Sequence, residues 1–267
     1  MAMQRSGCLP LGLPCLAQPQ SRHPLAALTT AIDRSFKRSN RTYGARRVWH
    51  DVLAEGLPCG LHRVERLTRE NGLRARPRRR GLPKDTGEHA AVAENLLDRS
   101  FQAAAQNQKW LADFTYIWTA KGWLYVAADI DLLSRRVVGW AMKAEITAQL
   151  VTDALLMAIW RRGKPDSLLH HSDQGSQYTS EQFQKLMADH GITCSMSRSG
   201  NVWDYAPIKS FLSSLKTERT ARKVYRTRDE ARADVFDYIE RFYNPQRRHS
   251  TLGYLSPIAF EEQAMLA

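Results

Sequence analysis

Long apolar runs and cysteines are scarce in this sequence of 267 residues. No apolar run approaches the roughly 20 residues that a membrane helix needs, which argues against a membrane-spanning protein. The four cysteines have no paired spacing, so the sequence predicts neither a zinc site nor a disulfide framework and suits a reducing cytosol. Prolines interrupt the apolar stretch that begins at Leu9, and only Arg5 supplies positive charge ahead of it. We therefore expect an irregular N-terminus over residues 1–24 rather than a signal peptide.

Acidic residues are outnumbered by basic ones. The 27 Asp and Glu stand against 39 Lys and Arg, which gives a formal net charge of +12. This balance favours a polyanionic partner, with nucleic acid first and an anionic membrane second. A generically basic protein would have the same total, so the clustering of the charges matters more, and the arginines do cluster over residues 74–80.

Three short helices are predicted over residues 25–80, because apolar residues recur at helical spacing over residues 25–36, 48–53 and 61–67. Such a group suits a helix-turn-helix-like module, although a plain three-helix bundle has the same pattern. The arginine run directly behind it favours phosphate neutralisation, and so DNA binding. The residues that we expect to contact DNA are Arg46, Arg47, Arg63, Arg74, Arg76, Arg78, Arg79 and Arg80.

Beyond residue 81 the pattern predicts an α/β core. A linker over residues 81–107, with one short helix near 90–97, precedes strands at 110–119, 123–130 and 136–142. A helix at 147–160, a strand at 167–171, a helix at 180–190 and a strand at 192–197 follow. Helices at 205–217 and 228–243 complete the expected elements. Three strands joined by hairpins and then alternating helices and strands predict a mixed five-stranded sheet with helices on its faces.

Two aspartates occupy unusual places in this pattern. Asp113 lies inside the first strand, and Asp173 directly follows the fourth. Alone, the first could pair with an arginine and the second could cap a helix or a turn. If the two strands are neighbours, both carboxylates meet on one patch and need a cation between them. Mg²⁺ accepts few carboxylates plus water and phosphate oxygens, so the pair favours a metal site for phosphoryl transfer, with His170 and His171 expected to line it rather than to bind the metal.

Five stretches make the chain resemble a known family. They are RTYGARRV at 41–48, WLADFTYI at 110–117, HSDQGSQY at 171–178, SFLSSLKTE at 210–218 and YNPQRRHSTLGY at 243–254. In these stretches the chain resembles bacterial insertion-sequence transposases of the second-reading-frame type, whose catalytic core is similar to that of retroviral integrases. The resemblance implies an RNase-H-like fold, Mg²⁺ or Mn²⁺, and cutting and joining of insertion-sequence ends and target DNA. It also implies a homo-oligomer on DNA in the bacterial cytoplasm, associated with the nucleoid, and no membrane partner.

With this resemblance the expected division has five parts. An irregular N-terminus at 1–24 precedes a helical DNA-binding module with a basic tail at 25–80. A linker at 81–107 leads to an integrase-like catalytic core at 108–220. A C-terminal helical extension occupies 221–267.

The chain departs from the family pattern at its third catalytic acid. The resemblance implies two catalytic aspartates and a glutamate; Asp113 and Asp173 match the aspartates, and Lys209 stands at the glutamate position. Glu218 lies about half a turn away from the Lys209 face of the same helix, so we do not expect it to replace the missing acid. The sequence therefore predicts weakened metal binding and impaired catalysis. Tyr205 departs too, where the family has asparagine.

Asp129 is a further departure, because it interrupts the apolar second strand. We expect an unpaired buried carboxylate there, which is costly, and so expect Asp129→Val to raise thermal stability. Three functions remain open: a DNA strand-transfer protein that is impaired, a non-catalytic DNA-binding protein or dominant-negative transposase partner, and, less favoured, an RNase-H-like nuclease. Fold alone does not separate them.

Overall fold

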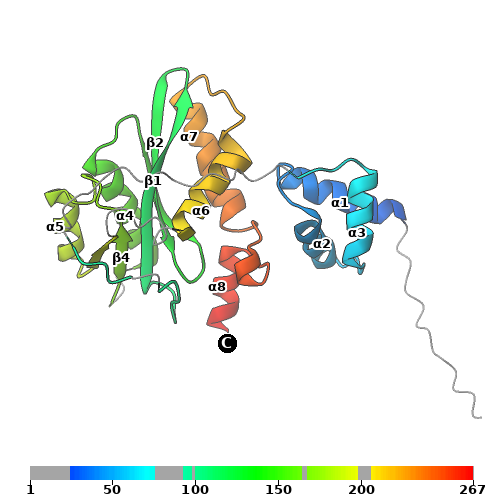
Figure 1. Cartoon of the computed structure of the whole chain (residues 1–267), viewed down its shortest axis with the longest axis horizontal. Helices are drawn as coiled ribbons and strands as arrows, with labels where there is room; N and C mark the ends of the chain where they lie inside the picture. Colours follow the sequence, from blue (N-terminus) through cyan, green and yellow to red (C-terminus); the bar gives the residue numbers. More distant parts are fainter. Residues whose placement is uncertain (1–24, 76–92, 98–99, 164–166, 198–205, 267) are drawn as a thin grey trace, which may run out of the picture.

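The computed structural model describes residues 25–75, 93–97, 100–163, 167–197 and 206–266. A helical module stands beside an α/β core (Figure 1) and consists of α1 (Leu25–Arg38), α2 (Ala45–Ala54) and α3 (Leu61–Glu70). Its interior is built from the apolar residues at helical spacing, with Ile32, Val48 and Val64 fully buried. The three predicted helices are confirmed.

The core is built on a mixed five-stranded sheet with the strand order β3-β2-β1-β4-β5. The strands are β1 (Lys109–Thr119), β2 (Gly122–Asp131), β3 (Val137–Lys143), β4 (Leu169–Ser172) and β5 (Thr193–Met196). The first three are antiparallel neighbours, whereas β4 runs parallel to β1 and β5 runs parallel to β4. This is the predicted α/β sheet of the RNase-H-like fold.

Helices cover both faces of this sheet (Figure 1). One face packs against α4 (Ala148–Arg162) and α5 (Glu181–Asp189), through a buried cluster that includes Leu155 and Phe183. The other packs against α6 (Ala206–Ser214) and α7 (Arg228–Phe236), through a cluster that includes Phe211 and Val235. Gly139 of β3 permits the close approach of α4, because a Cβ there would lie 2.2 Å from the Ala154 carbonyl oxygen. Successive side chains along β1 and β2 therefore pack alternately into the buried clusters on the two faces of the sheet.

The last part of the chain holds more structure than the sequence predicts. Helix α6 continues as a π-helix, η2 (Leu215–Thr220), and α7 continues as a second one, η3 (Asp237–Tyr243). A 3₁₀ turn, η4 (Ser250–Leu252), and helix α8 (Pro257–Met265) follow, and α8 was not predicted. Its start has a recognisable signal, because Ser256 accepts a hydrogen bond from the Ala259 amide and proline occupies the first turn.

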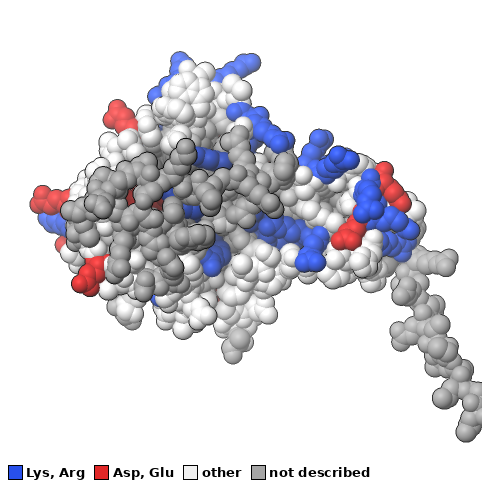
Figure 2. Space-filling view, in the orientation of Figure 1, with Lys and Arg blue, Asp and Glu red and all other residues white. Residues whose placement is uncertain are grey.

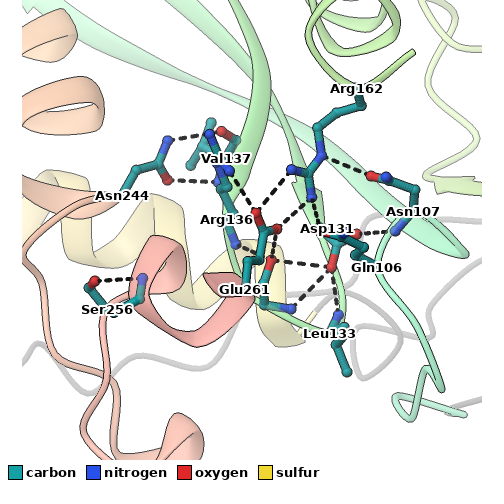
Figure 3. A network of polar contacts seen from close by, with 12 residues as sticks. Gln106, Asn107, Asp131, Leu133, Arg136, Val137, Arg162, Asn244, Ser256 and Glu261 are labelled. Carbon is teal, nitrogen blue, oxygen red and sulfur yellow. Dashed lines mark hydrogen bonds and ion pairs between the residues drawn. The ribbon is translucent and has the colours of Figure 1, made fainter. Parts of the chain in front are cut away.

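A buried carboxylate, Glu261, holds α8 against the end of the sheet (Figure 3). Arg162 and Arg136 form ion pairs with it at 2.5 Å and 2.6 Å, and the Ser134 hydroxyl donates to it at 2.7 Å. Although burial favours the neutral acid, these hydrogen bonds hold the pKa of Glu261 below its ordinary value. The Asn244 side chain adds a second link by bonding the amide and the carbonyl of Val137. The C-terminal segment is thus tied to the sheet that carries the aspartates.

The short helix expected near residues 90–97 is wrong for residues 93–97, and residues 90–92 lie outside the described part. This segment lies alongside β5 instead: the Leu96 amide donates to the Ser195 hydroxyl, and the Met196 amide donates to the Glu94 carbonyl. Its backbone groups are used in contacts that a helix would not allow.

Within the described ranges, no helix combines the length and apolar character that crossing a membrane requires.

Candidate active site

The parallel pairing of β1 and β4 brings the two aspartates together. Trp110 lies opposite His170 and Leu111 opposite His171, so the same register continued by two residues puts Asp113 opposite Asp173. Asp113 is only 4% exposed, whereas Asp173 is half-buried at the end of its strand. Burial raises the pKa of Asp113; the Lys209 ammonium opposes that rise and the Asp173 carboxylate adds to it.

Lys209 is the third side chain at this patch. Helix α6 buries Ile208, Phe211 and Leu212 against the sheet, and this packing turns position 209 towards β1. The Lys209 Nζ lies 2.7 Å from the Asp113 Oδ2, and its side chain remains 46% exposed. The lysine therefore stands at the carboxylates rather than on a free surface of the helix.

Backbone amides engage the other oxygens of the pair. The Asp113 Oδ1 accepts from the Phe114 amide at 2.9 Å, and the Asp173 Oδ1 accepts from the Gly175 amide at 2.9 Å in a tight turn. Gly175 permits that turn, because a Cβ there would lie 2.9 Å from the same carboxylate oxygen. Both aspartates are held in fixed orientations.

The donor set around these aspartates does not fit a two-metal centre. Among the described residues, no three His, Cys, Asp or Glu side chains are grouped so that they could hold one metal ion. One oxygen of Asp113 contacts an ammonium, which repels a divalent cation. Of the two carboxylates that converge here, that of Asp113 thus has Lys209 as its counter-ion.

The two histidines of β4 point to opposite sides of the sheet. His171 contacts the Ser195 hydroxyl at 2.9 Å, and burial lowers its pKa to about 4, so the ring is neutral at pH 7. His170 lies under α5 against Phe183 and away from Asp113. Its Nε2 lies 2.8 Å from the Asp129 Oδ1. Only His171 shares the sheet face of the aspartates, so the expectation that both line the site is wrong for His170.

The expected unpaired state of Asp129 is wrong. Its side chain is buried, as the sequence predicts, but His170 is a buried partner for it. Burial raises the pKa of Asp129, and the contact with His170 opposes that rise. No pattern within β2 identifies a partner that is 41 positions away in the sequence.

Glu218 is bound by Arg247 and Tyr238, which the sequence did not predict. Arg247 contacts both of its carboxylate oxygens, at 2.6 Å and 2.8 Å, and the Tyr238 hydroxyl donates to it at 2.8 Å. These contacts lower the pKa of Glu218 in spite of its burial. Arg247 belongs to the quoted stretch 243–254, which is the one sequence signal that could have identified it.

Four of the arginines expected to contact DNA lie in the described part of the helical module. Arg46 and Arg74 are exposed, whereas Arg47 and Arg63 are half-buried. Figure 2 shows Lys and Arg side chains gathered where the module adjoins the core. The remaining predicted residues of this set, Arg76, Arg78, Arg79 and Arg80, lie outside the described residues.

Comparisons with known proteins cover most of the chain. The family described as Integrase core domain matches residues 103–202, a second Integrase core domain family matches residues 209–265, and the HTH-like domain family matches residues 24–81. "Transposase InsF for insertion sequence IS3A" of Escherichia coli (strain K12) is 44% identical over 230 residues, which are 86% of this chain and 80% of the relative.

Two further matches are a second curated relative and a solved structure. "Insertion element IS600 uncharacterized 31 kDa protein" of Shigella sonnei is 41% identical over 227 residues, which are 85% of this chain and 84% of the relative. Among solved structures, the catalytic core domain of BIV integrase is 20% identical, with a TM-score of 0.45, over 60% of this chain and 97% of that one.

Proposed function

The chain belongs to the family of transposases of insertion sequence IS3, and we propose that this member binds insertion-sequence and target DNA without joining DNA ends. The family supplies the transposase and integrase-core function. The finer proposal is that Asp113 and Asp173 are the catalytic aspartates of this member and that Lys209 replaces the third acid. One observation carries it: the Lys209 Nζ lies 2.7 Å from the Asp113 Oδ2.

Electrostatics supports the proposal that this substitution stops the reaction. The three positions carry a formal charge of −1 with lysine, whereas the family pattern carries −3. An ammonium about 4 Å from a carboxylate gains roughly 4 kcal/mol at an effective dielectric constant near 20, and exposure of the lysine reduces that gain. The lysine therefore competes for the same carboxylate oxygens that a divalent cation would need, and it also repels that cation.

Binding of the Mg²⁺ or Mn²⁺ that the family implies is accordingly weakened or lost in this member. Asp113 and Asp173 are the residues that could still offer oxygens to an ion. The third position offers a cation in place of a ligand. Glu218 cannot substitute, because Arg247 and Tyr238 already occupy both of its oxygens.

DNA binding rests on features that Lys209 leaves unchanged. We propose the helical module with its basic tail, residues 25–80, as a DNA-binding domain, and residues 108–220 as the core that faces the DNA end. The net charge of +12, the HTH-like match and the exposed Arg46 and Arg74 support this division.

A second candidate function follows from the same ion pair. A chain that keeps its DNA-binding surfaces and lacks end joining would act as a dominant-negative partner in a mixed oligomer with an active relative. Mixing this chain with an active relative on labelled insertion-sequence ends should then lower the joining rate of the relative in proportion to the fraction of this chain.

The direct test is a strand-transfer assay on labelled insertion-sequence ends, with DNA binding measured by fluorescence anisotropy on the same preparations. We expect the unmodified chain to bind DNA and to form no joined product. The variant that combines Lys209→Glu with Tyr205→Asn should form joined product in Mg²⁺. The matched variant with Lys209→Gln should not, because it removes the ammonium without adding a carboxylate. Joining by the unmodified chain, abolished by Asp113→Asn, would contradict the proposal.

A further inference from the structure

Three of the five stretches that carry the family resemblance meet at one pocket, away from the paired aspartates. Thr42 and Arg47 reach it from the helical module, and Ser213 and Thr217 reach it from α6 and η2. The third side is closed by Arg247, His249, Ser250 and Thr251. The cavity has a volume of about 270 Å³. Residues separated by some two hundred positions thus line one space, and neither the paired aspartates nor Lys209 is among them.

The lining of the pocket is rich in hydrogen-bond donors and poor in carboxylates. Seven of its eleven residues are serine or threonine, two are arginine, and one is His249. Glu218 is the only acid. Hydroxyl and guanidinium groups in this proportion suit a tetrahedral oxyanion, whose oxygens accept several hydrogen bonds each, and do not suit a metal ion.

The single carboxylate of the pocket is already neutralised. Arg247 holds both Glu218 oxygens, and the Arg247 Nη2 also donates to the Ser214 hydroxyl at 3.1 Å. Burial and the nearby arginines lower the pKa of His249 to about 2, so its ring adds no charge. The remaining formal charge is the single positive charge of Arg47.

Arg47 shares its nearest carboxylate, Glu218, with Arg247, whose guanidinium makes the direct ion pair. The Arg47 guanidinium carbon lies 5.4 Å from the centre of the Tyr43 ring, and no carboxylate of the described chain forms an ion pair with it. Burial, and then the charge of Arg247, lower the pKa of Arg47, and the Glu218 carboxylate opposes this shift. Two half-buried or buried guanidinium groups that share one carboxylate leave a positive charge uncompensated, and a bound anion would relieve this.

We propose that this pocket binds a phosphate group, and that the phosphate belongs to a DNA backbone that passes between the helical module and the core. The choice of DNA rests on the proposed function. Two placements favour it over free phosphate: the exposed Arg46 precedes Arg47 on α2, and Ser210 of the pocket directly follows Lys209 on α6. One strand could therefore contact the module, this pocket and the aspartate patch in succession.

The test compares two nearly isosteric variants of the full chain, Ser213→Asp and Ser213→Asn. Only the first adds a negative charge to the pocket, where it can pair with Arg47 and repel an anion. Binding of a duplex oligonucleotide is measured at several salt concentrations. The slope of log affinity against log salt should become shallower by about 0.9 in Ser213→Asp, as expected for one lost phosphate contact, and should stay unchanged in Ser213→Asn.

A second pair of variants keeps the test decisive if Ser213→Asp does not fold. Arg47→Gln should give the same shallower slope. Arg232→Gln removes an equal charge from α7, away from the pocket lining, and should leave the slope within error. If Ser213→Asp and Arg47→Gln both have the same salt slope as the unmodified chain, the proposal of a phosphate-binding pocket is wrong, while DNA binding by the chain is unaffected.

An experiment with inorganic phosphate distinguishes the two possible sources of the bound phosphate group, which are a DNA backbone and free phosphate. Without DNA, phosphate should raise the melting temperature of the unmodified chain and of Ser213→Asn, and should raise that of Ser213→Asp less. If phosphate raises the melting temperatures of the variants by different amounts while their salt slopes for DNA binding are equal, the bound phosphate does not come from a DNA backbone. Failure of the unmodified chain to bind DNA at any salt concentration would instead overturn the proposed function, and with it the DNA arm of this inference.

Discussion

Two buried aspartates on neighbouring strands have opposite surroundings. Asp113 faces α6 and pairs with Lys209, whose side chain is 46% exposed. Asp129 faces α4 and α5 and pairs with His170, and less than 3% of either side chain is exposed. The contact distances are nearly equal, at 2.7 Å and 2.8 Å.

The difference shows that distance alone does not identify a functional pair. Lys209 can leave Asp113 and enter water, so the Asp113 carboxylate is open to exchange its partner. Neither member of the Asp129 pair can reach solvent, so that pair is a fixed part of the core. Four variants test this contrast through the stability of the fold.

The largest effect is expected from breaking the enclosed pair. His170→Leu keeps an apolar body against Phe183 and leaves Asp129 buried without its partner. The free energy of unfolding should fall by about 3–5 kcal/mol, as measured by urea denaturation. A loss below about 1 kcal/mol would mean that water reaches Asp129 and that the two pairs do not differ in this way.

An intermediate effect with a pH signature is expected from Asp129→Asn, which can keep the contact to His170 and removes the charge. Because burial raises the pKa of Asp129, the native state favours the protonated acid, and stability is lost as the pH rises through that raised pKa. The asparagine variant should exceed the unmodified chain by about 1–3 kcal/mol near pH 7. The gap should close on acidification towards the ordinary carboxyl pKa of 3.8. A gap that widens on acidification would show that the pKa is lowered instead.

Asp129→Val is the control for the hydrogen bond, because it removes the charge and the acceptor together. Its melting temperature should lie below that of Asp129→Asn, by an amount that corresponds to about 1–3 kcal/mol for the unpaired histidine nitrogen. Equal melting temperatures for the two variants would show that the contact between His170 and Asp129 contributes nothing.

The smallest effect is expected at the exposed pair. Lys209→Met keeps the aliphatic body of the side chain and removes the ammonium. The free energy of unfolding should change by less than about 1 kcal/mol, because a half-exposed lysine is largely hydrated in either state. A loss as large as that of His170→Leu would mean that Lys209 is a structural residue and not a replaceable counter-ion.

The sequence predicted the sheet well, because strand periodicity and element order are local signals. It placed Asp113 with Asp173 only on the condition that the first and fourth strands are neighbours, which the pairing of β1 with β4 supplies. It also predicted the position of Lys209, through the family resemblance. It missed α8 and the Glu261 network, since these depend on contacts with Ser134 and Arg162, which are about a hundred positions or more away. It missed the partner of Asp129 for the same reason. Register places His170 beside β1, but only the packed core shows which face that histidine occupies.

The most direct test of the central claim is a calorimetric titration of Mg²⁺ into the intact chain and into its Lys209→Glu variant. The claim is that the Lys209 ammonium occupies the carboxylate of Asp113 in place of a metal ion. It predicts no saturable binding heat for the unmodified chain, and saturable binding for Lys209→Glu that Asp113→Asn abolishes. Saturable Mg²⁺ binding by the unmodified chain that is lost in Asp113→Asn and unaltered by Lys209→Glu would contradict it.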